Sequence, residues 1–163
     1  CWEFGSNNMT SFKSASDNDS KIIFPQGDSK IIALNKDGQV IWNSEIPGDL
    51  KSEIIIFKST AYFVTQLPES KNSILLQGIS LQTGLNSWSK TVKYDSPINF
   101  TKLLKLDTNL LLTIDNKSLL IIDPKKDSSL LTERIEPELT SNISISGKSV
   151  FFANSGNQVI EYS

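Results

Sequence analysis

The sequence repeats itself with a period of 40 to 46 residues, and this repeat limits the fold more than any other feature. Residues 33–42 and 79–88 align without gaps. In both segments an apolar run leads into a turn, and a Gly stands four residues before a Trp. The two tryptophans, Trp42 and Trp88, are 46 residues apart. Such a period predicts a fold assembled from repeated supersecondary units.

Two weaker copies extend the pattern over nearly the whole chain. Residues 122–131 form a degenerate third copy, with Leu131 in the Trp position, 43 residues after the preceding Trp. Counting backwards, Trp2 lies 40 residues before Trp42. A final copy is cut short at residues 159–163.

Each period holds four short apolar runs that are separated by turn residues. In the third period these runs are residues 101–106, 110–114, 118–122 and 128–135. The separators are rich in Asp and Asn, which close turns with their own side chains. The runs are too short for helices and read as strands. Four strands in each period predict β-propeller blades. A β-sandwich also has regular short strands, but it does not place Gly and Trp at one offset in successive periods.

The pattern apolar-Leu-Asn-x-x-Gly-x-x-x-Trp in residues 33–42 resembles the PQQ-like repeat. This resemblance implies an all-β propeller of four-stranded antiparallel blades. In that family the Trp of strand d packs between neighbouring blades. The residues to which we assign such a structural packing role are Trp2, Gly38, Trp42, Gly84, Trp88 and Leu131.

In this register the chain is one partial propeller over residues 1–163. The expected blades are residues 10–46, 52–93, 99–136 and 139–163, the last completed by a d strand such as residues 1–4. Two alternatives are compatible with this register: the chain forms a closed four-bladed ring, or it forms part of a larger ring. The larger ring, of about seven or eight blades, is favoured because PQQ-like repeats normally close with more blades. Its remaining blades would come from another segment or from a second copy in a head-to-tail dimer.

The composition argues against catalysis. The chain has no His and a single Cys, which removes the usual general base and makes a Ser/His/Asp triad unattainable. The quinone-dependent dehydrogenases named for this repeat use adjacent cysteines, a calcium held by Glu and Asn, and an Asp base. This sequence shows no such cluster. We therefore expect no enzymatic activity, no cofactor, no metal and no small-molecule substrate.

The charge of the sequence limits the classes of partner that can be expected. The net charge is −2, and no cluster of Lys and Arg accompanies the aromatic residues. Nucleic acid is therefore not expected as a partner. Cys1, followed by the polar stretch 5–20, resembles the acylated Cys and tether of a mature bacterial lipoprotein. The alternative is that the numbering starts at a fragment boundary, since Trp2 and Phe4 are bulky for a tether.

Among PQQ-like propellers without a quinone site, the chain resembles the C-terminal half of the lipoprotein B subunit of the bacterial β-barrel assembly machinery. This implies a scaffold, lipid-anchored on the periplasmic side of the outer membrane, that binds the periplasmic domains of the central barrel subunit. Two alternatives remain: the chain is a fragment of a quinoprotein dehydrogenase, or it is a eukaryotic luminal or adaptor propeller in the secretory pathway. The second alternative would be supported by glycosylation of the Asn-x-Ser/Thr sequons, which are at Asn8, Asn18, Asn99, Asn116 and Asn142.

We expect the partner surface on loops, because the strands are used to build the blades. Loops that join strand d to the next strand a, and strand b to strand c, share one face of a propeller. That face would carry residues 47–52, 67–72 and 93–99. The candidate partner loop consists of Leu67, Pro68, Glu69, Ser70, Lys71 and Asn72. An idle insertion is the alternative, and shortening the loop to a two-residue turn is expected to leave the fold intact.

Overall fold

A computed structural model describes residues 15–16, 21–126, 128–134 and 138–162, with side chains described for 21–126 and 138–162. All the secondary-structure elements in these described residues are β-strands. The described part of the chain accordingly contains no helix that is long and apolar enough to cross a membrane. The residues gather into two compact units, 1–98 and 99–163.

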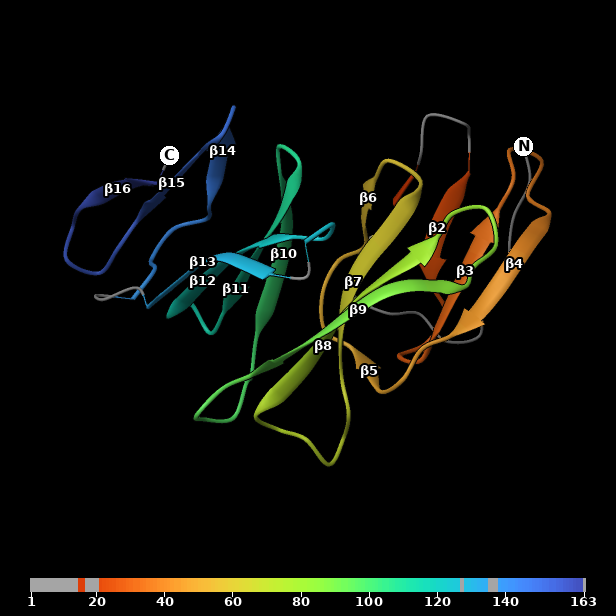
Figure 1. Ribbon diagram of the computed structural model, residues 1–163, viewed down its shortest axis with the longest axis horizontal. Helices are drawn as coiled ribbons and strands as arrows, with labels where there is room; N and C mark the ends of the chain where they lie inside the picture. The colour runs from red at the N-terminus through yellow and green to blue at the C-terminus, as the bar shows by residue number, and fades with distance from the viewer. Residues whose placement is uncertain (1–14, 17–20, 127, 135–137, 163) are drawn as a thin grey trace. The chain divides into compact units, whose positions relative to one another are not determined.

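The first unit contains two antiparallel sheets, each ordered as the chain runs (Figure 1). The strands of the first sheet are β1 (Ala15–Ser16), β2 (Ile22–Pro25), β3 (Lys30–Leu34) and β4 (Val40–Glu45). The strands of the second sheet are β5 (Asp49–Leu50), β6 (Ile55–Phe57), β7 (Thr60–Gln66), β8 (Ser73–Ser80) and β9 (Asn86–Lys93). Both β5 and β6 pair with β7, so they form one interrupted first strand.

The interruption between β5 and β6 is stabilised by a side chain. The Ser52 hydroxyl accepts the Val64 N–H at 2.9 Å and donates to the carbonyl of Glu53 at 2.9 Å. One residue earlier, the Lys51 N–H donates to the Val64 carbonyl at 2.8 Å. A hydroxyl thus replaces a main-chain partner where the strand leaves the sheet edge, and the buried N–H stays satisfied.

The two sheets of the first unit enclose a hydrophobic core. Alternate residues of β3 and β7 enter it, among them Ala33 and Phe63, as expected from the two-residue period of a strand. The intervening residues of β7, Tyr62 and Val64, are also buried. The remaining core residues are Ile23, Ile31, Trp42, Ile46, Leu50, Ile54, Ala61, Ile79 and Leu81.

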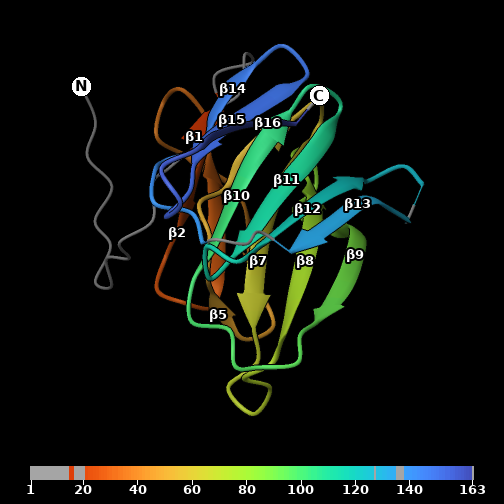
Figure 2. The ribbon, with the colours of Figure 1, turned by 90° about the vertical axis from the view of Figure 1, so that its left-hand side faces the viewer.

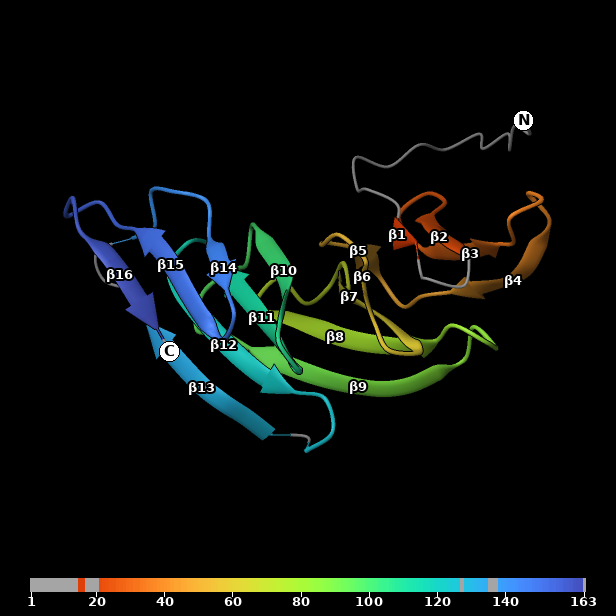
Figure 3. The same ribbon diagram turned by 90° about the horizontal axis from the view of Figure 1, so that it is seen from above.

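The second unit contains a four-stranded sheet and a three-stranded sheet. The four strands, shown side by side in Figure 2, are β10 (Thr101–Leu106), β11 (Asn109–Ile114), β12 (Ser118–Asp123) and β13 (Ser128–Arg134). The three, shown in Figure 3, are β14 (Ser144–Ser146), β15 (Ser149–Ala153) and β16 (Val159–Tyr162). Their shared core contains Leu106, Leu111, Leu119, Leu139, Val150 and Phe152.

The last strands of the three larger sheets share one irregularity. In each, the pairing register shifts directly beside the Trp position of the repeat. The pairs at that position are Trp42 with Ala33, Trp88 with Gly78, and Leu131 with Ile121. The main chain at Leu131 therefore occupies the place that Trp holds in the other two sheets. Such bulges twist an outer strand and blunt its edge.

Candidate functional site

In the first unit, the connector between the two sheets is tied to a loop of the sheet that it leaves. This connector follows β4, and the loop joins β2 to β3. The Ile46 N–H donates to the carbonyl of Ser29 at 2.9 Å, and the Leu50 N–H donates to the carbonyl of Asp28 at 2.8 Å. The side chains of Ile46 and Leu50 are buried in the core. The connector is thus held by main-chain bonds and by apolar anchors.

The connector that follows β9 is held in the same way. The Tyr94 N–H donates to the carbonyl of Asn72 at 2.8 Å, and the Ile98 N–H donates to that of Lys71 at 2.7 Å. Ile98 is buried. The two acceptors belong to the loop between β7 and β8, which is the candidate partner loop. Its main chain therefore braces the next connector.

The second unit repeats this arrangement. The Leu139 N–H donates to the carbonyl of Asn116, in the turn between β11 and β12, at 2.9 Å. Leu139 is a buried member of the core of that unit. Three connectors, each bound to the preceding sheet by a buried apolar residue, indicate a structural device that recurs with the repeat.

The candidate partner loop is also fixed internally. The Ser70 N–H donates to the carbonyl of Leu67 at 3.0 Å, and the Ser73 N–H donates to that of Ser70 at 3.3 Å. From the end of β7, the Gln66 side-chain amide donates to the carbonyl of Lys71 at 3.0 Å. Loop backbones that are tied at several points present their side chains in a defined arrangement.

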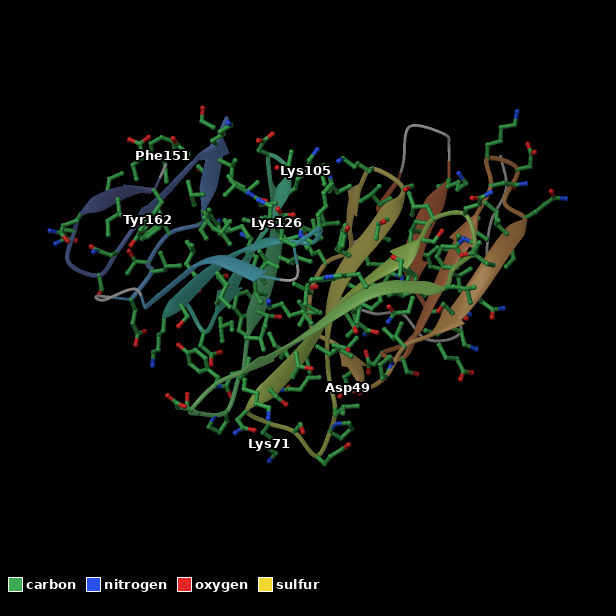
Figure 4. The ribbon with its side chains drawn as sticks, viewed as in Figure 1. Asp49, Lys71, Lys105, Lys126, Phe151 and Tyr162 are labelled. Carbon is green, nitrogen blue, oxygen red and sulfur yellow. The ribbon has the colours of Figure 1, made fainter. Side chains whose placement is uncertain are left out.

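The side chains of this loop face solvent. Leu67 is 40% exposed, Ser70 is half-buried, and the other four residues of the loop are exposed. On one flank Gly48, with a φ of 75°, brings its main chain against the carbonyl of Gln66. Asp49 pairs with Lys51 at 3.7 Å, and Asp49 and Lys71 lie at the same end of the unit in Figure 4.

We name the loop face of the first unit as residues 46–52, 67–72 and 94–98. Hydrogen bonds join 67–72 to 94–98, and β5 of the first segment pairs with the end of β7. The surface combines an exposed leucine, exposed prolines at 47, 68 and 97, and charges of both signs. Such a mixed, mostly polar surface suits a polypeptide partner.

The geometry changes one expectation about the loop. Shortening it to two residues would delete the carbonyls of Lys71 and Asn72, which hold Tyr94 and Ile98. Shortening would thus disturb the connector as well as the side chains, so it does not test binding alone. Substitution of exposed side chains keeps these bonds and is the better test.

Of the structural residues named from the sequence, Trp42 and Gly84 lie in direct contact across the two sheets. The Trp42 Nε1–H donates to the carbonyl of Leu81 at 2.9 Å. Gly38 has a φ of 79°, and its N–H donates to the carbonyl of Asn35 at 3.0 Å. The Asn35 side chain closes the same turn by accepting the N–H of Gln39 at 2.9 Å.

Trp88 has a different environment from Trp42. Its ring meets Tyr62 edge-to-face, with centroids 6.0 Å apart, and Gly78 leaves the space for this contact, since a Cβ there would lie 2.8 Å from the Tyr62 ring. The Trp88 Nε1–H is buried and has no hydrogen-bond partner in the part of the chain that the structure describes. Cys1 and Trp2 lie outside the described residues.

Within the described ranges, no three or more His, Cys, Asp or Glu side chains gather in a group that could hold a metal ion. The hydrogen-bonded connectors were not among the features predicted from the sequence. The sequence holds a weak signal for them: Leu50 stands three residues after Pro47, Ile98 stands directly after Pro97, and the two apolar residues are 48 residues apart. Isolated apolar residues in loops are common, so this signal acquires meaning only from the hydrogen bonds.

Comparison with solved structures identifies the fold. BamB from Moraxella catarrhalis superposes with a TM-score of 0.72 at 15% identity, over 98% of this chain and 48% of that chain. The computationally designed Ika4 protein superposes with a TM-score of 0.68 at 10% identity, over 97% of this chain and 94% of that chain. BBS1N, solved in complex with ARL6DN, superposes with a TM-score of 0.60 at 7% identity, over 86% of this chain and 45% of that chain.

No protein-family model and no curated protein matches the sequence. The structural similarity confirms the predicted all-β propeller fold of small antiparallel sheets. The chain spans about half the length of the BamB chain and nearly all of the Ika4 chain. The number of blades in the complete ring, and the division into one partial propeller, stay predictions.

Proposed function

We propose that this chain is a non-catalytic scaffold that binds protein partners through the loop face of the first unit. One observation carries the proposal: the candidate partner loop has a fixed main chain and outward side chains. Gln66, Tyr94 and Ile98 hold its carbonyls, while Leu67 and the charged Glu69 remain exposed. Binding then requires little ordering of the surface, which lowers the entropic cost of association.

Two structural relatives support a protein-binding role. BBS1N was solved in complex with ARL6DN, so a protein of similar fold forms a protein complex. BamB shares the fold over nearly the whole of this chain. The absence of His and the single Cys in the sequence support a scaffold without catalysis.

The more specific proposal is a role in the assembly of outer-membrane proteins. It rests on the similarity to BamB and on Cys1 with the polar stretch that follows it. The scaffold would then be anchored by a lipid at Cys1 on the periplasmic side of the outer membrane. Its partner would be the periplasmic domains of the central barrel subunit.

The test is a calorimetric titration of the chain with those purified periplasmic domains. The proposal expects a saturable binding isotherm, with a serum albumin titration as the control for non-specific heat. A flat isotherm with correctly folded partners would contradict the assembly role. Reduction of a redox dye by the chain with quinone, calcium and alcohols or sugars would contradict the non-catalytic role.

A further inference from the structure

Phe100 is an exposed aromatic residue at the start of the second unit. Its side chain is 52% exposed, and among the residues that the structure describes it is the only exposed aromatic side chain. It stands directly before β10, whose first residue, Thr101, is buried. The chain therefore leaves an aromatic ring in water at the point where the next residue enters the sheet.

Asp115 fixes the main chain of Phe100. Asp115 follows β11, the strand that pairs with β10 (Figure 2). Its carboxylate accepts the N–H of Phe100 at 2.7 Å and that of Asn99 at 2.9 Å. Its own N–H donates to the Phe100 carbonyl at 2.9 Å. Both main-chain polar groups of Phe100 are thus bound, so the ring has little freedom to lose when a partner buries it.

Phe100 also follows the loop face closely along the chain. Consecutive Cα atoms are about 3.8 Å apart, so the Cα atoms of Ile98 and Phe100 are separated by at most about 7.6 Å. Ile98 belongs to the loop face, where its N–H donates to the carbonyl of Lys71 at 2.7 Å. A polypeptide that covers the loop face at Ile98 is therefore within reach of the Phe100 ring.

The charged neighbours of Phe100 favour a protein partner over a lipid surface. Aromatic residues that bind membranes usually stand among basic residues that attract anionic lipids. Beside Phe100 the structure has the carboxylate of Asp115. In the same turn, the exposed Lys117 is paired with Glu138 at 3.0 Å. Charges of both signs around an apolar side chain are typical of a protein contact, with its apolar centre and polar rim.

We propose that Phe100 is an aromatic anchor of the scaffold, whose ring enters an apolar pocket of the protein partner that binds the loop face. This inference rests on the proposed function and adds to it a residue that contributes much of the binding energy. A Phe ring that becomes buried in a contact removes a large apolar area from water. Single exposed apolar residues are common. The fixed main chain and the position next to the loop face therefore carry the assignment, together with the exposure.

Calorimetric titration with the purified periplasmic domains tests the anchor through Phe100→Ala, with Val159→Ala as the control. Both side chains are exposed and belong to the second unit, so the thermal unfolding midpoint should stay the same in both variants. Phe100→Ala should weaken binding by about tenfold or more. Phe100→Leu keeps part of the apolar side chain and should weaken binding less, and Val159→Ala should bind as the unchanged protein does. Equal affinities for Phe100→Ala and the unchanged protein would overturn the anchor and leave the scaffold proposal standing.

A second measurement follows the ring itself. para-Fluorophenylalanine in place of Phe100 gives a fluorine NMR signal whose position differs between light and heavy water while the ring is exposed. The periplasmic domains should remove most of this difference, and a difference that persists in the saturated complex would overturn the anchor. Its loss only with phosphatidylethanolamine–phosphatidylglycerol vesicles would assign the ring to lipid and overturn the anchor as well. A flat isotherm for the unchanged protein would instead contradict the scaffold role, and the anchor with it.

Discussion

The ring of Trp42 lies against Gly84, so that a Cβ at residue 84 would stand 2.7 Å from Trp42 Cδ2. The repeat places Gly84 four residues before Trp88, yet the structure joins it to the Trp of the preceding copy. The neighbouring Leu81 carbonyl accepts the Trp42 Nε1–H at 2.9 Å. The Gly of the second copy therefore packs against the Trp of the first copy, and not against the Trp of its own copy.

Replacement of Gly84 by Ala should destabilise the first unit strongly. The added methyl would meet the Trp42 ring, and the φ of 71° is unfavourable for Ala. Together these effects should cost about 2–4 kcal/mol in the free energy of unfolding. Gly147→Ala is the control, since its φ is 62° but nothing lies within 4 Å, and it should cost about 1 kcal/mol. Urea unfolding followed by circular dichroism measures both, and equal costs would refute the packing role.

Trp42→Phe should cost more stability than Trp88→Phe. Both changes remove similar ring area, but only the first removes a hydrogen bond from the Leu81 carbonyl. An unpaired buried carbonyl costs about 1–3 kcal/mol. The Trp88 N–H finds no acceptor among the described residues, so its loss carries no such penalty. Urea unfolding of the two variants compares them, and a larger loss for Trp88→Phe would contradict the assignment.

Asp115 should stabilise the start of β10 through its carboxylate. One oxygen accepts the N–H of Asn99 at 2.9 Å and that of Phe100 at 2.7 Å. Asp115→Ala removes both bonds and should cost about 2–4 kcal/mol in unfolding free energy. Asp115→Asn retains a carbonyl acceptor and suits the φ of 49°, so we expect about half that loss. Thermal unfolding distinguishes the variants. Identical unfolding midpoints for Asp115→Ala and the unchanged protein would exclude a stabilising role for the Asp115 carboxylate.

The Gln66 side chain should control the rigidity of the candidate partner loop. Gln66→Ala removes the amide that holds the Lys71 carbonyl, so the amide of Ile98, which shares that carbonyl, should exchange about three- to tenfold faster. Lys71→Ala is the matched control because its carbonyl is retained. Amide exchange read by NMR tests this. Equal rates in both variants would show that Gln66 does not brace the loop.

The strands could be predicted from the sequence because their pattern is local. In the third period the expected runs and strands β10 to β13 agree within one residue at every boundary. Asp107 and Asp115, both in the separators, have positive φ values as turn residues of this kind often do. Alternation and turn chemistry act over a few residues, so a single sequence carries both signals.

The contacts of the candidate site could not be predicted in this way. The bonds from Tyr94 and Ile98 to the loop 67–72 join main-chain groups about 20 residues apart or more, and main-chain groups leave no mark in the sequence. The interruption between β5 and β6 depends on one hydroxyl, that of Ser52, in a chain rich in serine. The contact between Trp42 and Gly84 could be predicted only if it were known which copies of the repeat pack together.

The measurement that tests the scaffold proposal most directly compares two leucines at opposite ends of the same unit. Leu67, in the loop before β8, is 40% exposed, and Leu85, after β8, is 70% exposed. Leu67→Asp should weaken binding of the periplasmic domains by about tenfold or more, because it puts an unpaired charge into the buried contact. Leu85→Asp should leave the calorimetric dissociation constant unchanged. Equal affinities for both variants, or a loss only with Leu85→Asp, would contradict binding through the loop face.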